Sequence, residues 1–250
     1  MASSDPNLNE TPQGDASFAP TQWSVVLQAG QVGSAQSEAA LARLCQAYWF
    51  PLYSYVRRIG HSAEDAQDLT QEFFPRLLEK NYIGAAESEK GKFRSFLLVA
   101  LKRFLANEWD RANSQKRGGG QRLISLDLEE TETRYRAEPA DLMTPEVVFQ
   151  RRWVVTLLGR VLERLENELA ADGKGKLFAA LKVFLIGEHG DISYAEVAGR
   201  VQMTEGALRV TVHRLRQRYR ELLRAEIAST VASPDQVDDE IRSLFAAAAG

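Results

Sequence analysis

The chain has one cysteine and three histidines among its 250 residues, and this scarcity excludes several kinds of site. A single cysteine, Cys45, can form neither an internal disulfide nor a thiolate metal cluster. The histidines are far apart, and no glycine-rich loop is followed by Lys-Ser or Lys-Thr. No nucleophile has a base nearby in the sequence. We therefore expect a protein that is not an enzyme and that needs no cofactor or metal.

Long apolar runs are also missing. No run is long enough to cross a bilayer and no signal peptide is recognisable, so we expect a cytoplasmic protein that does not contact a membrane. The formal net charge of −3 would argue against a nucleic-acid partner if the charged residues were evenly spread along the chain. They are unevenly spread.

Charge is concentrated in three blocks. Residues 61–89 hold seven acids and two bases, a net charge of −5. Residues 90–122 hold nine bases and two acids, a net of +7, and residues 204–224 hold six arginines and two acids, a net of +4. An acidic block beside two basic blocks indicates both a protein partner and a nucleic-acid partner.

The most informative pattern begins at Ser193. Ser193 and Glu196 form a capping box that starts a short helix, and Thr204 caps a longer helix after a break at 201–203. Apolar residues spaced by three and four form the buried stripe of the second helix: Leu208, Val212, Leu215 and Tyr219. Its other face is rich in arginine. This pattern predicts a helix-turn-helix whose second helix fits a major groove, and the alternative is a helical hairpin with a solvated basic face.

Helical periodicity and linker composition divide the rest of the chain. Thr144 and Pro145 mark the start of a second domain, because they form a helix cap followed by proline at the first helical position. The stretch before them has no periodicity and predicts an extended linker without a core. We expect five parts: a disordered start (residues 1–20), a helical domain (21–112), a linker (113–143), a helix-turn-helix domain (144–230) and a helical extension (231–250). The predicted fold class is all-α, with two helical domains joined by a flexible linker and a winged-helix-like, four-helix C-terminal domain.

The acidic block predicts a helix opened by a second capping box. Leu69, Phe73 and Leu77 recur at four-residue spacing and predict its buried face. Four polar residues are then expected on the open face: Asp65, Asp68, Gln71 and Glu72. The residues alone favour a solvated surface over a docking surface. A cation site at the carboxylates of Asp65, Asp68 and Glu72 is disfavoured, because the sequence indicates no second segment that would supply further ligands.

Two segments resemble a known family. The segment MTEGALRVTVHRLRQRYRELL resembles the fourth conserved region of bacterial sigma factors, above all of the extracytoplasmic-function (ECF) group. The segment DAQDLTQEFF resembles their second conserved region, which docks on the β′ clamp helices of RNA polymerase. Family members usually have glycine in the turn of the helix-turn-helix, where this chain has Gln202. This departure weakens the turn argument without undoing it, because Gln202 need not adopt a positive φ.

The resemblance implies two partners and three sets of binding residues. The partners are core RNA polymerase, through the β′ clamp helices and the β flap, and promoter DNA, and an anti-sigma factor is a further candidate. The polymerase-binding set is Asp65, Asp68, Leu69, Gln71 and Glu72. The set for the −35 element is Thr204, Glu205, Arg209, Val210, His213, Arg214, Arg216 and Arg218, with Arg216 and Arg218 on phosphates. The set for the −10 element is Tyr82, Lys92, Phe93, Arg94, Lys102, Arg103, Asn107 and Arg111.

The helix expected from Phe93 to Ala112 interleaves aromatic and basic residues, which suits an unpaired DNA strand. The alternative is that its aromatics are core residues, and for Phe96 and Phe104 this alternative is favoured. The function implied is that of an ECF sigma factor that melts the −10 element. A dimeric helix-turn-helix regulator with an N-terminal sensing domain is the alternative, and a polymerase-binding adaptor without promoter function is a third.

The C-terminal extension is unusual for generic ECF sigma factors. Ser233 and Pro234 are expected to start a helix, with Gln236 closing a capping box. An apolar stripe follows: Val237, Ile241, Leu244 and Phe245. Because so short a helix is unstable alone, we expect it to fold back on the helix-turn-helix domain or to dock on a partner, and to modulate promoter access. The alternative is a frayed end.

Overall fold

The computed structural model describes residues 35–78, 92–114, 128–137, 143–186, 192–231 and 233–249. Every regular element within these ranges is a helix, so the all-α prediction is confirmed. The predicted start of the chain and Tyr82 lie outside the described residues. Within those residues, no helix has the length and apolarity needed to cross a membrane.

Three helices form the N-terminal group: α2 (Ala35–Arg58), α3 (Ala63–Leu78) and α5 (Phe93–Ser114). The chain turns after α2 at Gly60, whose φ of +107° suits glycine. Ser62 caps α3 as predicted, because its Oγ accepts a hydrogen bond from the Asp65 N–H at 3.0 Å. The same hydroxyl donates to the Asp65 carboxylate at 2.8 Å.

The second group begins with α7 (Pro145–Ala171), which Thr144 caps as predicted. Four more helices follow: α8 (Gly175–Leu181), α9 (Val183–Ile186), α10 (Tyr194–Arg200) and α11 (Glu205–Ala228). Ser193 caps α10 and Thr204 caps α11, with hydrogen bonds from backbone N–H groups at 3.1 and 3.2 Å. The short helix, tight turn and long helix of the predicted helix-turn-helix are therefore present.

No wing follows α11 in the part of the chain that the structure describes. A 3-10 turn, η1 (Pro234–Gln236), leads directly into α12 (Val237–Ala249), so the winged-helix-like part of the expectation is not confirmed. The predicted capping box at Ser233 was wrong, because Ser233 makes no side-chain cap hydrogen bond. The expectation that the extension folds back is confirmed, since α12 contacts α7 and α11.

One apolar core joins helices from both sides of the predicted linker. Tyr48 of α2 stacks on Trp153 of α7 with ring centroids 6.4 Å apart, and both side chains are almost fully buried. Leu222 of α11 and Leu244 of α12 belong to the same cluster. The helix-turn-helix has a second, smaller core built around Leu208 and Phe184. The predicted domain boundary is thus crossed by shared packing.

Part of the expected linker is folded. Helix α6 (Leu128–Arg136) contacts α3, and its buried Glu132 accepts hydrogen bonds from Arg57 at 2.7 and 3.1 Å and from the Tyr53 hydroxyl. Arg134 lies 3.9 Å above the Phe50 ring centroid. The prediction of an extended linker without a core was wrong here. An ion pair and a cation–π contact hold α6, and neither leaves a periodic apolar signal.

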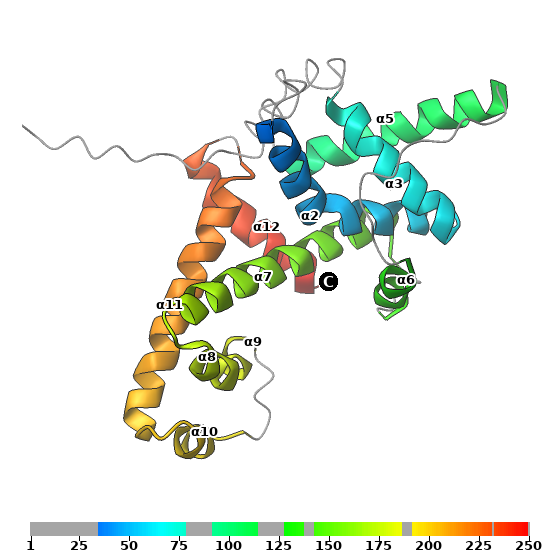
Figure 1. The fold of residues 1–250 in the computed structure, drawn as a ribbon. Helices are drawn as coiled ribbons and strands as arrows, with labels where there is room; N and C mark the ends of the chain where they lie inside the picture. Colours follow the sequence, from blue (N-terminus) through cyan, green and yellow to red (C-terminus); the bar gives the residue numbers. More distant parts are fainter. Residues whose placement is uncertain are drawn as a thin grey trace, which may run out of the picture.

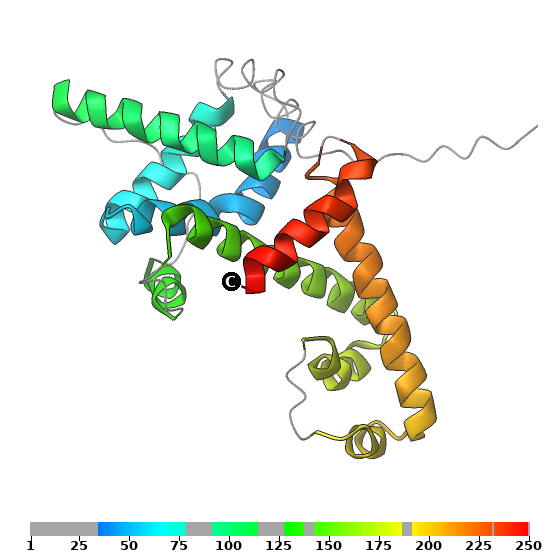
Figure 2. The ribbon, with the colours of Figure 1, turned by 180° about the vertical axis from the view of Figure 1, so that it is seen from behind.

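The arrangement separates two ends of the molecule. Figures 1 and 2 show α10 and the start of α11 at one end, and α3 and α5 at the other. Helix α7 connects the two ends, and α12 lies in the angle between α7 and α11. The two predicted DNA-binding helices, α11 and α5, are therefore held apart on one frame.

Candidate nucleic-acid and polymerase interface

The turn between α10 and α11 is closed by Gln202 in the left-handed region, with φ of +56°. The Met203 N–H donates to the Ala198 carbonyl at 3.0 Å and the Gln202 N–H donates to the Gly199 carbonyl at 3.4 Å. These two bonds form a Schellman motif, which requires a positive φ at this position. Gln202 does adopt a positive φ, so the turn keeps the geometry that glycine usually provides, at a cost of about 1 kcal/mol.

The open face of α11 carries the whole predicted −35 set. Leu208, Val212 and Leu215 are buried in the small core, which turns the opposite face of the helix outward. All eight predicted residues are exposed: Thr204, Glu205, Arg209, Val210, His213, Arg214, Arg216 and Arg218. The sequence pattern therefore identified the exposed face correctly.

Near its start, α11 has one arginine held in place and two residues without partners. Arg209 donates to Glu205 at 2.9 and 2.5 Å and lies 4.5 Å above the Tyr194 ring centroid. His213 and Arg214 make no ion pair or hydrogen bond with any other described side chain. Arg209 is thus held in position, whereas the Arg214 guanidinium pairs with no other described residue.

Arg216 and Arg218 differ from the rest, although both were predicted to hold phosphates. Arg216 donates to the Phe184 carbonyl at 3.2 and 2.9 Å, which ties α11 to α9. Arg218 holds the Glu168 carboxylate at 2.9 and 3.1 Å, and this hydrogen bonding lowers the pKa of Glu168. Both guanidinium groups therefore make contacts within the fold, although both residues are exposed, and their predicted phosphate contacts stay a prediction.

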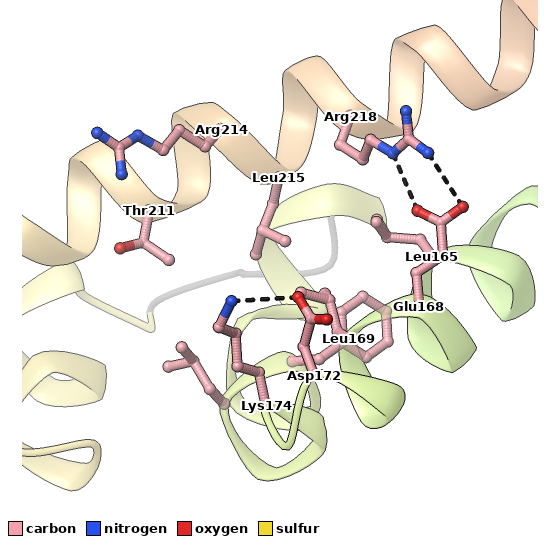
Figure 3. Close-up of a pocket in the computed structure, with 11 residues that line it drawn as sticks. Leu165, Glu168, Leu169, Asp172, Lys174, Thr211, Arg214, Leu215 and Arg218 are labelled. Atoms are coloured by element: carbon pink, nitrogen blue, oxygen red, sulfur yellow. Dashed lines mark hydrogen bonds and ion pairs between the residues drawn. The ribbon is translucent and has the colours of Figure 1, made fainter.

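A groove of about 450 Å³ lies between the end of α7, helix α8 and α11 (Figure 3). Its apolar lining comes from Leu165, Leu169, Leu177, Phe178 and Leu215. On its rim Arg218 reaches Glu168, and Lys174 reaches Asp172 at 3.2 Å (Figure 3). The site prediction included only Arg214 and Arg218 of its lining, because residues from three elements become neighbours only on folding.

Helix α3 presents three of the five predicted polymerase-binding residues to solvent. Asp65, Asp68 and Glu72 are exposed, and Leu69 is half-buried. Gln71 was expected on the open face, but its side chain is only 6% exposed. Gln71 lies three residues before the buried Phe74, so it shares the inner face of α3. No cluster of three or more potential metal ligands occurs in the described part of the chain.

Helix α5 divides the predicted −10 set into an exposed and a buried part. Lys102, Arg103, Asn107 and Arg111 are exposed. The same stretch also exposes Trp109, with 69% of its surface accessible, a residue that the predicted set omitted. Trp109 could have been found from the sequence by the stacking argument applied to this helix, which interleaves aromatic and basic residues.

The buried part of the set lies at the start of α5. Phe93 is fully buried and Arg94 is 4% exposed, so neither side chain is accessible to a DNA strand in this structure. The Phe93 N–H donates to the Thr230 carbonyl at 3.1 Å, and Arg94 pairs with Glu240 of α12 at 3.0 Å. Phe104 is buried, as its core assignment predicted, and Phe96 is half-buried against the same core.

A comparison with protein-family models identifies one region of the chain. Residues 44–115, which span most of α2 and all of α3 and α5, match the family model of Sigma-70 region 2. No curated protein and no solved structure matches the chain. The matched region includes the exposed carboxylates of α3 and the basic face of α5. The chain therefore carries a Sigma-70 region 2 domain, which supports a place in the sigma-factor family.

Proposed function

We propose that the chain is a sigma factor of the ECF group, which binds core RNA polymerase and directs it to particular promoters. The observation that carries this proposal is a combination within one chain. A Sigma-70 region 2 domain occupies one end, and a helix-turn-helix with an exposed basic face occupies the other. This combination supplies a polymerase-binding surface and two DNA-binding surfaces on one frame.

At the −35 element, α11 enters the major groove with its exposed N-terminal half. Arg209, Val210, His213 and Arg214 read base edges, because they share the open face of a helix of suitable width. Arg209 exchanges its Glu205 partner for a guanine edge, to which an arginine can donate two hydrogen bonds. Thr204 and Glu205 contact the backbone and bases at the helix start.

At the −10 element, the exposed face of α5 holds the unpaired strand. Lys102, Arg103, Asn107 and Arg111 contact phosphates and bases, and Trp109 provides a ring on which a base can stack. Binding to the unpaired strand offsets the free energy of unstacking, so no cofactor is required for strand opening.

The polymerase contacts involve two separate surfaces. Asp65, Asp68 and Glu72 on α3 dock on the β′ clamp helices, with Leu69 at the edge of the contact. The groove between α7, α8 and α11 receives the β flap, since it joins an apolar floor to a charged rim. Gln71 acts from the inner face of α3 by holding the helix rather than by touching polymerase. An anti-sigma factor remains a prediction from the family resemblance.

The region 2 match favours this function over a dimeric regulator, because it covers the helices that a regulator would use for sensing. In vitro transcription with core polymerase and a promoter library tests it. We expect transcripts from a defined subset of promoters only when the chain is added. A chain that binds core polymerase but starts no transcripts would be an adaptor, and one that binds palindromic DNA without polymerase would be a regulator.

A further inference from the structure

The start of α5 is a cationic site that α12 covers. Glu240 of α12 accepts from Arg94 Nε at 3.0 Å and from Arg94 Nη2 at 3.2 Å, and its carboxylate also lies 2.7 Å from Lys92 Nζ. Ser243, one turn further along α12, accepts from Arg94 Nη2 at 3.1 Å. Two cations at the start of α5, Arg94 in its first turn and Lys92 just before it, therefore share one carboxylate from the C-terminal extension.

The site is buried and carries surplus positive charge. The side chain of Glu240 is 1% exposed and that of Arg94 is 5% exposed. Arg94 lies 5.0 Å above the Trp153 ring centroid, yet its Nη1 makes no hydrogen bond among the described residues. Two positive charges and one negative charge leave a net of +1, and a donor remains unused. The site can therefore bind more anionic oxygen atoms than the two of the Glu240 carboxylate.

The cover itself is small. Helix α12 has 13 residues and buries Val237 and Leu244, while Phe245 is 58% exposed. Its other polar anchor, Asp238 with Arg224 at 2.6 Å, lies at the surface. A helix of this length is unstable alone, and a short element with few buried side chains is among the first parts of a protein to open. Helix α12 is therefore the part of the main core that we expect to open first.

We propose that Glu240 occupies a binding site for a DNA phosphate at the start of α5, so that α12 closes this site in the free chain and opens it when the chain binds polymerase and promoter. The proposal rests on the proposed function, because Lys92 and Arg94 belong to the predicted −10 set. The carboxylate imitates the phosphate: it presents two oxygens to the guanidinium fork, as a phosphate does. The phosphate of an unpaired strand then replaces it.

Binding of the free chain to a short single-stranded DNA of random sequence, measured by fluorescence anisotropy at fixed salt, tests the cover without polymerase. Glu240→Gln removes the negative charge and nearly preserves the shape, and we expect about tenfold tighter binding. The matched control is Asp239→Asn, which removes the same charge from the neighbouring position on α12, where Asp239 pairs with Arg242 at the surface. We expect the control to change the affinity less than twofold.

A double variant identifies the site. In Arg94→Met combined with Glu240→Gln, the gain should disappear, because the phosphate-binding cation is gone while the buried pair is replaced by neutral groups. Equal gains in Glu240→Gln and Asp239→Asn, or a gain that survives the loss of Arg94, would overturn the proposal. These outcomes do not depend on transcription, so they are separate from a failure of the sigma-factor function.

If Glu240→Gln does not fold, hydrogen exchange of the unaltered chain tests whether α12 opens. In the free chain, the amides of α12 and the Phe93 amide, which donates to Thr230, should be protected. In the complex with core polymerase and promoter DNA, α12 should lose protection while α7 keeps it. Unchanged protection of α12 in a complex that makes transcripts would refute the opening of this cover.

Discussion

The two predicted DNA-binding helices differ in what lies over them. The start of α11 is open, and its arginines either pair along their own helix or remain free. The start of α5 is closed, because Arg94 pairs with a glutamate 146 residues further along the chain. Both helices carry the same kind of basic pattern in the sequence. Local pattern thus identifies a basic helix, but contacts from distant elements determine whether its cations are accessible.

The largest effect is expected when the cation of the closed site is removed. Arg94→Ala leaves Glu240 buried with only Lys92 as a partner and removes the contact with Trp153. We expect the free energy of unfolding to fall by about 3 kcal/mol, measured by urea denaturation. Arg103→Ala on the exposed face of the same helix is the control, and it should change stability by less than about 0.5 kcal/mol. Equal effects would mean that the closed site is not a buried ion pair.

The second prediction concerns the other long-range pair, which fixes α6 on α2. Burial opposes ionisation of Glu132, but hydrogen bonds from Arg57 and Tyr53 outweigh it and hold the pKa below its ordinary value of 4.5. Glu132→Gln should therefore cost about 2 kcal/mol at neutral pH. Because the pKa is depressed in the folded state, this contribution is present above pH 4.5 and is lost as the pH falls through the folded-state pKa.

Urea denaturation of both chains across this pH range measures the effect. The difference between the unaltered chain and Glu132→Gln should shrink in acid. Glu64→Gln, at an exposed position of α3, serves as the control and should show no such trend. A difference that stays constant with pH would indicate that the Glu132 contact does not depend on its charge.

The third prediction concerns base recognition by the exposed start of α11. Arg209→Ala should weaken discrimination at one base pair of the −35 element by about 1–3 kcal/mol, if the arginine reads a guanine edge. Selection of bound sequences from a randomised −35 library measures this preference. Arg218→Ala should leave base preference unchanged and lower stability instead, since it loses the Glu168 contact. An unchanged preference in Arg209→Ala would place the reading face elsewhere on α11.

The fourth prediction concerns the exposed carboxylates of α3 and their binding to polymerase. Charge reversal by Glu72→Lys should weaken binding to core polymerase by about tenfold, because charges on a docking surface must complement the partner. Glu72 is exposed and lies 3.6 Å from Arg76, so the folded domain should survive the change. Glu64→Lys at the start of the same helix is the matched control. Equal affinities for the two variants, with unchanged circular dichroism, would exclude Glu72 from the docking surface.

The smallest expected effect concerns the turn that presents α11. Gln202→Gly should raise the free energy of unfolding by about 0.5–1 kcal/mol, because glycine relieves the strain of a positive φ. Gln217→Gly in the middle of α11 should have the opposite sign, since glycine weakens a helix interior by about 1 kcal/mol. Thermal unfolding of both variants checks the pair. A destabilised Gln202→Gly would mean that the glutamine side chain supports the turn.

The parts of the structure that the sequence predicted are those set by neighbours in the chain. Ser62, Thr144, Ser193 and Thr204 each cap the expected helix, because a cap and its N–H group lie three residues apart. The apolar stripe of α11 likewise follows from spacing alone.

The parts that were missed depend on partners far along the chain. Contacts with Arg57 and Tyr53 hold helix α6, and its sequence has no apolar repeat that would predict a helix. Gln71 is buried although its residue type suggests exposure, and the groove beside α8 combines residues from three helices. Arg94 illustrates the rule best: its sequence neighbours indicate a DNA contact, while Glu240 decides its accessibility.

Photo-crosslinking in the complex with core polymerase and promoter DNA tests the central claim most directly, namely that α11 and α5 of one chain hold two separate promoter elements. A photoreactive residue replaces Val210 on α11 in one variant and Trp109 on α5 in the other, both of which are exposed positions. We predict crosslinks from position 210 to double-stranded −35 DNA and from position 109 to the unpaired −10 strand. Crosslinks from both positions to the same DNA segment, or none from position 210, would contradict the account.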